Sequence, residues 1–208
     1  RTQTAMVTIV GRPNVGKSTL MNYLVGEKVA IVSNKPQTTR NRICGIVTQN
    51  DVQVIFLDTP GYHRPRTKLG DYMVNVSRNS IADVDLTILV VEPHVTIGPQ
   101  EDDLIKQITV SKCPAILAIN KIDTVKEKEK LISRIAEMTE YYDFDAIVPV
   151  SAQNGSGIKE LLEELKKLAF ESEHFFPEDT LTDQPERVLA GEIIREKILL
   201  NYNKEIPY

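Results

Sequence analysis

Short apolar runs alternate along the chain with longer stretches in which apolar residues recur at helical spacing. The apolar, β-branched runs predict strands over Ala5–Val10, Ile43–Thr48, Val52–Leu57, Leu86–Val91, Ala115–Ile119 and Ala146–Val150. The stretches with helical spacing predict helices over Lys17–Val25, Leu69–Ile81, Gln100–Thr109, Lys126–Tyr141 and Ile158–Phe170. Strands that alternate with helices are typical of an α/β fold, so we predict a sheet with helices on both faces.

The second and third predicted strands determine the type of sheet. Only residues 49–51 separate Ile43–Thr48 from Val52–Leu57. A parallel connection needs a crossover of about a dozen residues, whereas antiparallel neighbours can be joined by a short turn. We therefore predict a six-stranded, mixed sheet that is mostly parallel and contains this antiparallel pair.

The pattern changes after residue 170. Residues 171–185 contain Pro177, Pro185 and several acidic residues without a clear period, which is typical of a linker. An amphipathic pattern begins at Glu186 and predicts a helix that either packs back on the first domain or opens a second one. We divide the chain into a globular domain of residues 1–171, a linker of residues 172–185 and a C-terminal helix in residues 186–208.

The composition limits the function classes. A chain of 208 residues suits one domain of ordinary size with some extra length. The net charge of -4 excludes a polycation that binds nucleic acid along its whole length. Cys44 and Cys113 are far apart, so a disulfide framework is not expected and a reducing, intracellular setting is favoured. No apolar run approaches the roughly 20 residues that span a bilayer.

The segment GRPNVGKST, residues 11–19, carries the clearest chemistry. It follows a predicted strand, opens a predicted helix and matches the P-loop pattern G-x-x-x-x-G-K-[ST]. The glycines let backbone N–H groups point at phosphates, Lys17 is expected to reach the outer phosphates, and the Ser18 hydroxyl is expected to bind Mg²⁺. The residues predicted to bind the nucleotide here are Gly11, Arg12, Pro13, Asn14, Val15, Gly16, Lys17, Ser18 and Thr19.

The segment 120–123, Asn-Lys-Ile-Asp, predicts which base is bound. It follows a buried strand, at the sheet edge where α/β proteins bind ligands. The Asp123 carboxylate can accept N–H bonds from the ring and the exocyclic amine of guanine, whereas adenine would leave it unpaired at a cost of about 1–3 kcal/mol. We also expect Asn120 to bridge the base and the P-loop, Lys121 to lie along the base plane, and the backbone N–H groups of Ser151 and Ala152 to meet the guanine O6.

Two further segments are predicted to respond to the third phosphate. The strand ending at Leu57 leads into Asp58-Thr59-Pro60-Gly61, where Asp58 is expected to hold Mg²⁺ mainly through water and the Gly61 N–H to sense the γ-phosphate. Residues 36–40 include two threonines, one of which would complete the Mg²⁺ shell when GTP is bound. The predicted metal ligands are Ser18, Thr39 and Asp58, and the predicted nucleotide contacts here are Thr38, Asp58, Thr59, Pro60 and Gly61.

Taken together, the motifs GRPNVGKS, QTTR, DTPG, NKID and SA resemble those of P-loop GTPases of the group that includes Era, the engA-like double GTPases and TrmE. Residues 176–197 resemble the connector and first helix that lead into the KH domain of the Era family. The resemblance implies a bacterial GTPase that uses GTP, GDP and Mg²⁺. It also implies a mainly cytoplasmic location, with part of the protein at the inner face of the cell membrane.

The same resemblance implies partners. Era-family GTPases bind the 3′ end of small-subunit ribosomal RNA through the KH domain and aid assembly of the 30S subunit. We find no Gly-x-x-Gly loop after Glu186, so this chain alone is expected to bind RNA weakly. A monomer that does not bind DNA is expected. A TrmE- or engA-like GTPase acting in tRNA modification or large-subunit assembly is the alternative, and a kinase or a module with a structural nucleotide is more distant.

The hydrolysis rate is predicted to be slow. Many GTPases orient the attacking water with a Gln after the Asp-x-x-Gly turn, but this chain has Tyr62, so we predict about 10⁻³–10⁻² s⁻¹ or below. In the TrmE-like group, an Asn at the position of Asn14 helps hold a K⁺ ion; the alternative here is an Asn that stabilises the loop. The predicted catalytic residues are Lys17, Thr39, Gly61 and Asn14.

Overall fold

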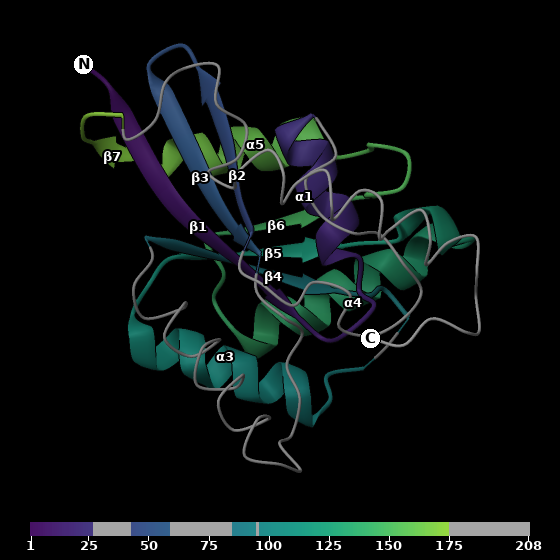
Figure 1. Ribbon diagram of the computed structural model, residues 1–208. Helices are drawn as coiled ribbons and strands as arrows, with labels where there is room; N and C mark the ends of the chain where they lie inside the picture. The colour runs from purple at the N-terminus through teal and green to yellow at the C-terminus, as the bar shows by residue number, and fades with distance from the viewer. Residues whose placement is uncertain (27–42, 59–84, 95, 175–208) are drawn as a thin grey trace, which may run out of the picture.

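The computed structural model describes residues 1–26, 43–58, 85–94 and 96–174 (Figure 1). Within these ranges the elements are β1 (Gln3–Gly11), α1 (Lys17–Val25), β2 (Ile43–Gln49), β3 (Val52–Asp58), β4 (Leu86–Val91), α3 (Pro99–Ser111), β5 (Ala115–Ile119), the short 3₁₀ helix η1 (Ile122–Thr124), α4 (Lys128–Tyr141), β6 (Ala146–Pro149), α5 (Ile158–Lys167) and β7 (Phe170–Glu171). The helix predicted over Leu69–Ile81 and the pattern predicted in residues 186–208 lie outside the described residues.

Parallel pairing builds the centre of the sheet. The strand order is β2-β3-β1-β4-β5-β6, and β7 pairs with β1. Strand β1 is parallel to β3 and β4, β4 to β5, and β5 to β6, whereas β2 is antiparallel to β3. The mixed, mostly parallel sheet that the three-residue turn predicted is confirmed.

Among the described residues the sheet has seven strands rather than the predicted six. Helix α5 ends at Lys167 instead of continuing to Phe170, and the two residues of β7 pair antiparallel with Gln3 and Thr4. Pairing between β1 and β4 begins only at Val7, whereas β3 pairs along β1 from Gln3 onward. The start of β1 therefore has one edge that β4 does not reach, and β7 takes the backbone hydrogen bonds there.

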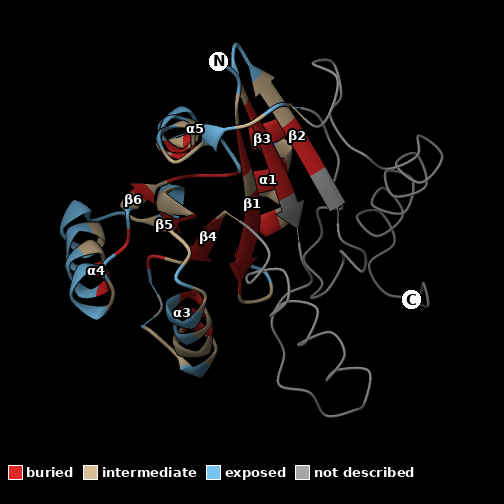
Figure 2. Ribbon diagram, turned by 90° about the vertical axis from the view of Figure 1, so that its left-hand side faces the viewer, coloured by how far each residue is buried: buried red, intermediate tan, exposed pale blue. Residues whose placement is uncertain are grey.

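Two apolar clusters form the core, one on each face of the sheet. Leu20 of α1 and Leu161 of α5 belong to one cluster, and Leu104 of α3 and Met138 of α4 belong to the other. Strands β4 and β5 are buried along their length, as Figure 2 shows in red. A strand with both faces covered needs no polar alternation, which explains the continuous apolar run AILAI of β5. Helices on both faces are therefore confirmed.

The parallel register places four loops at one edge of the sheet. Because strands β1, β4, β5 and β6 are parallel to one another, their carboxyl ends lie at the same edge of the sheet. The described residues that follow are 12–16, 92–94, 120–123 and 150–157. Motifs that are more than 100 positions apart in the sequence thus lie next to one another.

Candidate nucleotide-binding site

The P-loop connects β1 to α1 through two left-handed residues. Asn14 has φ 64° and Gly16 has φ 100°, and Gly16 is the N-cap of α1. Asn tolerates this conformation better than most side chains, and Gly adopts it without steric cost. A loop of this shape turns backbone N–H groups toward one concave side at the positive end of a helix, which is the geometry that binds an anion.

Gly16 is required by a neighbour as well as by its backbone angle. A Cβ atom at this position would lie 2.3 Å from Nδ2 of Asn120. Gly11 is equally restricted, because its Cβ would lie 2.7 Å from the carbonyl oxygen of Val90 and 2.9 Å from Cγ2 of Val15. Both glycines of the motif therefore allow the P-loop to pack tightly against β4 and β5.

Asn120 joins the P-loop to the segment after β6. It is 2% exposed, and its Nδ2 donates to the carbonyl oxygen of Val15 at 2.7 Å while its Oδ1 accepts a hydrogen bond from the backbone N–H of Ala152 at 2.9 Å. The expected bridge from Asn120 to the P-loop is therefore present. A buried amide with both ends bonded has one preferred position, so this side chain fixes the spacing of the loops.

Lys17 is held inside its own loop. The side chain is buried, and Nζ donates to the carbonyl oxygens of Gly11 at 3.0 Å and Arg12 at 3.1 Å. These carbonyls keep the ammonium group at the mouth of the loop, where the phosphates of a nucleotide bind in P-loop proteins. The phosphate-binding role of Lys17 stays a prediction.

Asp123 lies in η1 and presents an exposed carboxylate. Its Oδ1 accepts a hydrogen bond from the buried Ser151 hydroxyl at 2.8 Å. The Ser151 side chain therefore orients the Asp123 carboxylate, a contact that the sequence did not predict. The N–H of Ser151 donates to the carbonyl oxygen of Ser156 at 2.9 Å. The N–H of Ala152 donates to Oδ1 of Asn120. Of the predicted O6 donors, Ala152 would have to share its N–H with Asn120.

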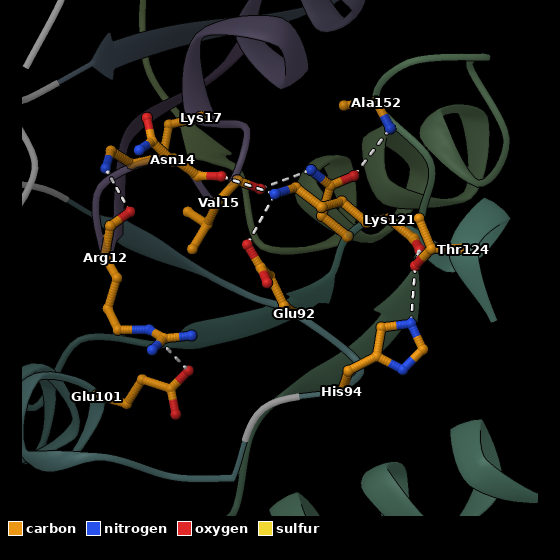
Figure 3. Close-up of polar contacts among 11 residues, drawn as sticks. Arg12, Asn14, Val15, Lys17, Glu92, His94, Glu101, Lys121, Thr124 and Ala152 are labelled. Atoms are coloured by element: carbon orange, nitrogen blue, oxygen red, sulfur yellow. Dashed lines mark hydrogen bonds and ion pairs between the residues drawn. The ribbon is translucent and has the colours of Figure 1, made fainter. Parts of the chain in front are cut away.

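Lys121 forms a second connection to the P-loop. It has φ 65°, and its Nζ donates to the carbonyl oxygen of Asn14 at 2.8 Å and to Oε1 of Glu92 at 2.7 Å (Figure 3). Glu92 directly follows β4. The two bonds connect Lys121 to the P-loop and to the residue after β4, and its expected position along the base plane stays a prediction.

Arg12 does not turn its guanidinium group toward the phosphate side. Figure 3 shows the side chain extending to Glu101, where Nε lies 3.5 Å from Oε1. Glu101 is 1% exposed and also lies 3.6 Å from Nη2 of Arg134 in α4. Burial raises the pKa of the Glu101 carboxyl, and the two guanidinium groups oppose that shift. Of the predicted P-loop set, Arg12 thus contributes its backbone to the site and its side chain to the packing behind it.

Several predicted residues lie outside the described residues. These are Thr38, Thr39, Thr59, Pro60 and Gly61. Asp58 is described as the last residue of β3, where it pairs in register with Ile9, two residues before Gly11. The end of β3 is therefore next to the start of the P-loop, as a shared Mg²⁺ site with Ser18 requires.

Sequence reasoning missed Glu92 and Glu101. Glu92 had a usable signal, because it follows a buried parallel strand at the edge where the other motifs lie. Glu101 had none, because an acidic residue in the first turn of a helix is ordinary helix-dipole chemistry in a sequence. Only the packing of α3 against the P-loop and α4 buries it.

Comparison with known proteins places this site in a family. Residues 6–121 match the family model described as 50S ribosome-binding GTPase. The chain is 48% identical over 206 residues to a GTPase Era of Ruminiclostridium cellulolyticum, covering 99% of this chain and 69% of that relative. It is 45% identical to a GTPase Era of Alkaliphilus metalliredigens, covering 99% and 70%.

The chain belongs to the Era family of GTPases. As an Era-family protein it is an enzyme that hydrolyses GTP. A crystal structure of Era in complex with MgGDPNP and nucleotides 1506-1542 of 16S ribosomal RNA has a TM-score of 0.92 at 38% identity and covers 100% of this chain and 70% of that chain. A crystal structure of an Aquifex aeolicus Era variant bound to GDP.AlF4- has a TM-score of 0.91 at 38% identity, covering 99% and 70%. The similarity extends into residues 172–208, which favours Era over the TrmE- and engA-like alternative.

Helices that could cross a bilayer are absent from the described part of this Era-family chain, since none is both long and apolar enough.

We expect Gly16→Ala to weaken GDP binding at least about 100-fold, because the new methyl group displaces Asn120 and a shift of about 1 Å at a site can cost this much. Isothermal titration calorimetry measures the change. Gly26→Ala is the matched control: Gly26 is also left-handed, with φ 83°, but its Cβ would meet nothing within 4 Å. Equal GDP affinity in the two variants would contradict the role of the Gly16–Asn120 contact.

Proposed function

We propose that this Era-family GTPase is a slow, nucleotide-dependent switch that assists assembly of the small ribosomal subunit by binding the 3′ end of its ribosomal RNA. The observation that carries the proposal is the similarity, over the whole chain, to an Era structure that contains nucleotides 1506-1542 of 16S ribosomal RNA. The site supports nucleotide binding, because the segments that follow β4, β5 and β6 lie at the same sheet edge as the P-loop.

We propose three successive parts of the chain with different roles. Residues 1–171 form the GTPase domain, residues 172–185 the linker, and residues 186–208 the first helix of a KH-type domain that binds RNA. Supporting the first boundary, β7 ends at Glu171. The next residues still contact the domain, since the N–H of Ser172 donates to the carbonyl of Thr2 at 3.1 Å.

GTP and GDP are the proposed nucleotides. Asp123 is exposed and oriented by Ser151, so its carboxylate can accept the two N–H bonds that guanine offers. Lys17, Asn14, Gly61 and Thr39 are the proposed catalytic residues. With Tyr62 in place of a water-orienting Gln, positioning and charge are the main sources of acceleration, so the proposed rate stays near 10⁻³–10⁻² s⁻¹.

Mg²⁺ is the proposed metal ion, and the backbone arrangement supports it. Ser18 lies in the first turn of α1, and Asp58 pairs in parallel register with Ile9, two residues before Gly11. A hydroxyl and a carboxylate are the oxygen ligands that Mg²⁺ prefers. Ser18, Asp58 and Thr39 would hold the ion, which supplies charge neutralisation on the phosphates when it is bound.

Further expectations concern the setting of the whole protein. We propose a monomer in the bacterial cytoplasm, with partial peripheral association at the inner face of the cell membrane. DNA is not a proposed ligand, and the net charge of -4 supports this, because DNA affinity depends on a positively charged surface.

The base selectivity predicts a switch of specificity. Xanthine carries a carbonyl where guanine carries its exocyclic amine, so Asp123→Asn, which supplies an N–H donor, should bind XDP better than GDP. We expect a loss of GDP affinity of at least about tenfold, since each mismatched buried partner costs about 1–3 kcal/mol. Calorimetry with GDP, XDP and ADP measures it.

Asp143→Asn is the control for this prediction, because Asp143 is an exposed aspartate at the amino end of β6, opposite the site. Its GDP affinity should match that of the unmodified chain. Unchanged GDP preference in Asp123→Asn, or equal affinity of the unmodified chain for ADP, would rule out this mode of base recognition.

Potassium is proposed as a cofactor through Asn14. An arginine finger gives about 10³–10⁵ in rate, so even a partial substitute should make GTP hydrolysis at least about tenfold faster in K⁺ than in Na⁺ at equal ionic strength. Asn14→Gly keeps the left-handed backbone and removes the side-chain oxygen, so this variant should lose the K⁺ advantage. Equal rates in the two salts with the unmodified protein would reject the potassium role and leave Asn14 as a loop residue.

The ribosomal role is tested with the full-length protein that contains this sequence. Ultraviolet crosslinking in cells followed by sequencing should recover the 3′ end of small-subunit ribosomal RNA. The same protein carrying Gly16→Ala should recover it less, because the RNA contact is proposed to depend on the nucleotide. Recovery of tRNA or large-subunit RNA instead would support the TrmE- or engA-like alternative.

A further inference from the structure

Arg12 connects two parts of the molecule through two different atoms. Its carbonyl oxygen accepts Nζ of Lys17 at 3.1 Å, on the phosphate side of the P-loop. Its guanidinium group extends the other way and pairs with Glu101 at 3.5 Å (Figure 3). A force that holds the side chain of Arg12 therefore also holds the carbonyl that positions Lys17.

The buried carboxylate of Glu101 holds the Arg12 side chain by electrostatic attraction. The side chain is 1% exposed, and a carboxylate removed from water needs compensating positive charge. Arg134 supplies one guanidinium at 3.6 Å and Arg12 supplies the other. Since Arg12 is 24% exposed, its guanidinium could otherwise stay in water, and the buried carboxylate is what draws it down against α3.

Arg134 anchors this pair from the far side. Its side chain is 3% exposed and comes from α4, while Glu101 comes from the first turn of α3. Arg134 also pairs at 3.3 Å with Glu137, which is 44% exposed and lies toward solvent. A row of alternating charges thus runs from the surface of α4 through α3 to the P-loop.

We propose that Glu101 and Arg134 are positioning residues for the nucleotide, acting through Arg12 on the P-loop and on Lys17. The proposal rests on the nucleotide site proposed above and adds to it two residues outside the P-loop and the base-binding segments. Both lie in helices, α3 and α4, outside the loops proposed to contact the nucleotide. They restrict the P-loop to fewer conformations. The conformation that they favour is the one in which the backbone N–H groups and the Lys17 ammonium face the same point.

The test compares two isosteric changes on either side of Arg134. Glu101→Gln removes the buried charge, and we expect the dissociation constant for GDP to rise about tenfold and kcat/KM for GTP to fall by a similar factor, since small misplacements in a site cost up to about 100-fold. Glu137→Gln, the matched control on the exposed side, should change both less than about twofold. Calorimetry and a phosphate-release assay measure these values, and urea unfolding reports stability in parallel.

A double-variant experiment separates positioning from general stability. If Glu101 acts through Arg12, Glu101→Gln should add nothing to the GDP affinity loss of Arg12→Gln. Independent losses that add, or equal effects of Glu101→Gln and Glu137→Gln, would overturn the proposal. Should Glu101→Gln fail to fold, Arg134→Lys, which keeps the charge but shortens its reach, should show the same dependence on Arg12, and an effect independent of Arg12 would overturn it. Failure of the unmodified chain to bind GDP would instead contradict the proposed function.

Discussion

The Asn120 side chain, buried between three segments of the chain, makes the two hydrogen bonds on which the geometry of the site depends. Nδ2 donates to the P-loop at Val15, and Oδ1 accepts from Ala152 after β6. Leaving either buried partner unsatisfied would cost about 1–3 kcal/mol. Gly16 is part of the same arrangement, because any side chain there would occupy the space of the amide. The P-loop and the segment after β5, which are proposed to bind phosphate and base, therefore share one contact, and neither segment can move independently.

The sheet makes this contact possible. Strands β1 and β5 are separated by β4, and their parallel register brings residues 11 and 120 to the same edge. Because β4 and β5 are buried on both faces, their ends are fixed by core packing, and the loops that follow inherit that rigidity. Lys121 adds a second connection by bonding Asn14 and Glu92. The positions of the polar groups thus follow from the apolar residues beneath them.

Charge behind the P-loop serves a different purpose from charge inside it. The ammonium of Lys17 faces the phosphate side, whereas Arg12, Glu101 and Arg134 form a buried row beneath it. Removing one partner of a buried pair costs about 3–5 kcal/mol, although replacing the whole pair with apolar groups is often neutral. Such a row is weak evidence for stability. The proposed role of these buried charges is to hold Arg12, the second residue of the P-loop, in one orientation.

The sequence by itself determined the elements and the motifs, because both are local. Apolar periodicity gave the bounds of α1, β4 and β5, and the spacing of glycines and Lys17 gave the P-loop. It also predicted an acceptor carboxylate, Asp123, just after a buried strand, whereas the exposure of that carboxylate is visible only in the structure. Only the tertiary structure decided the pairing of β7 with the start of β1, the turn of Arg12 toward Glu101, and the use of the Ala152 N–H by Asn120. Each of these contacts joins residues that are far apart in the sequence. The pattern of residues along the chain does not show which edge of β1 lacks a partner strand, or that other elements bury the Glu101 carboxylate.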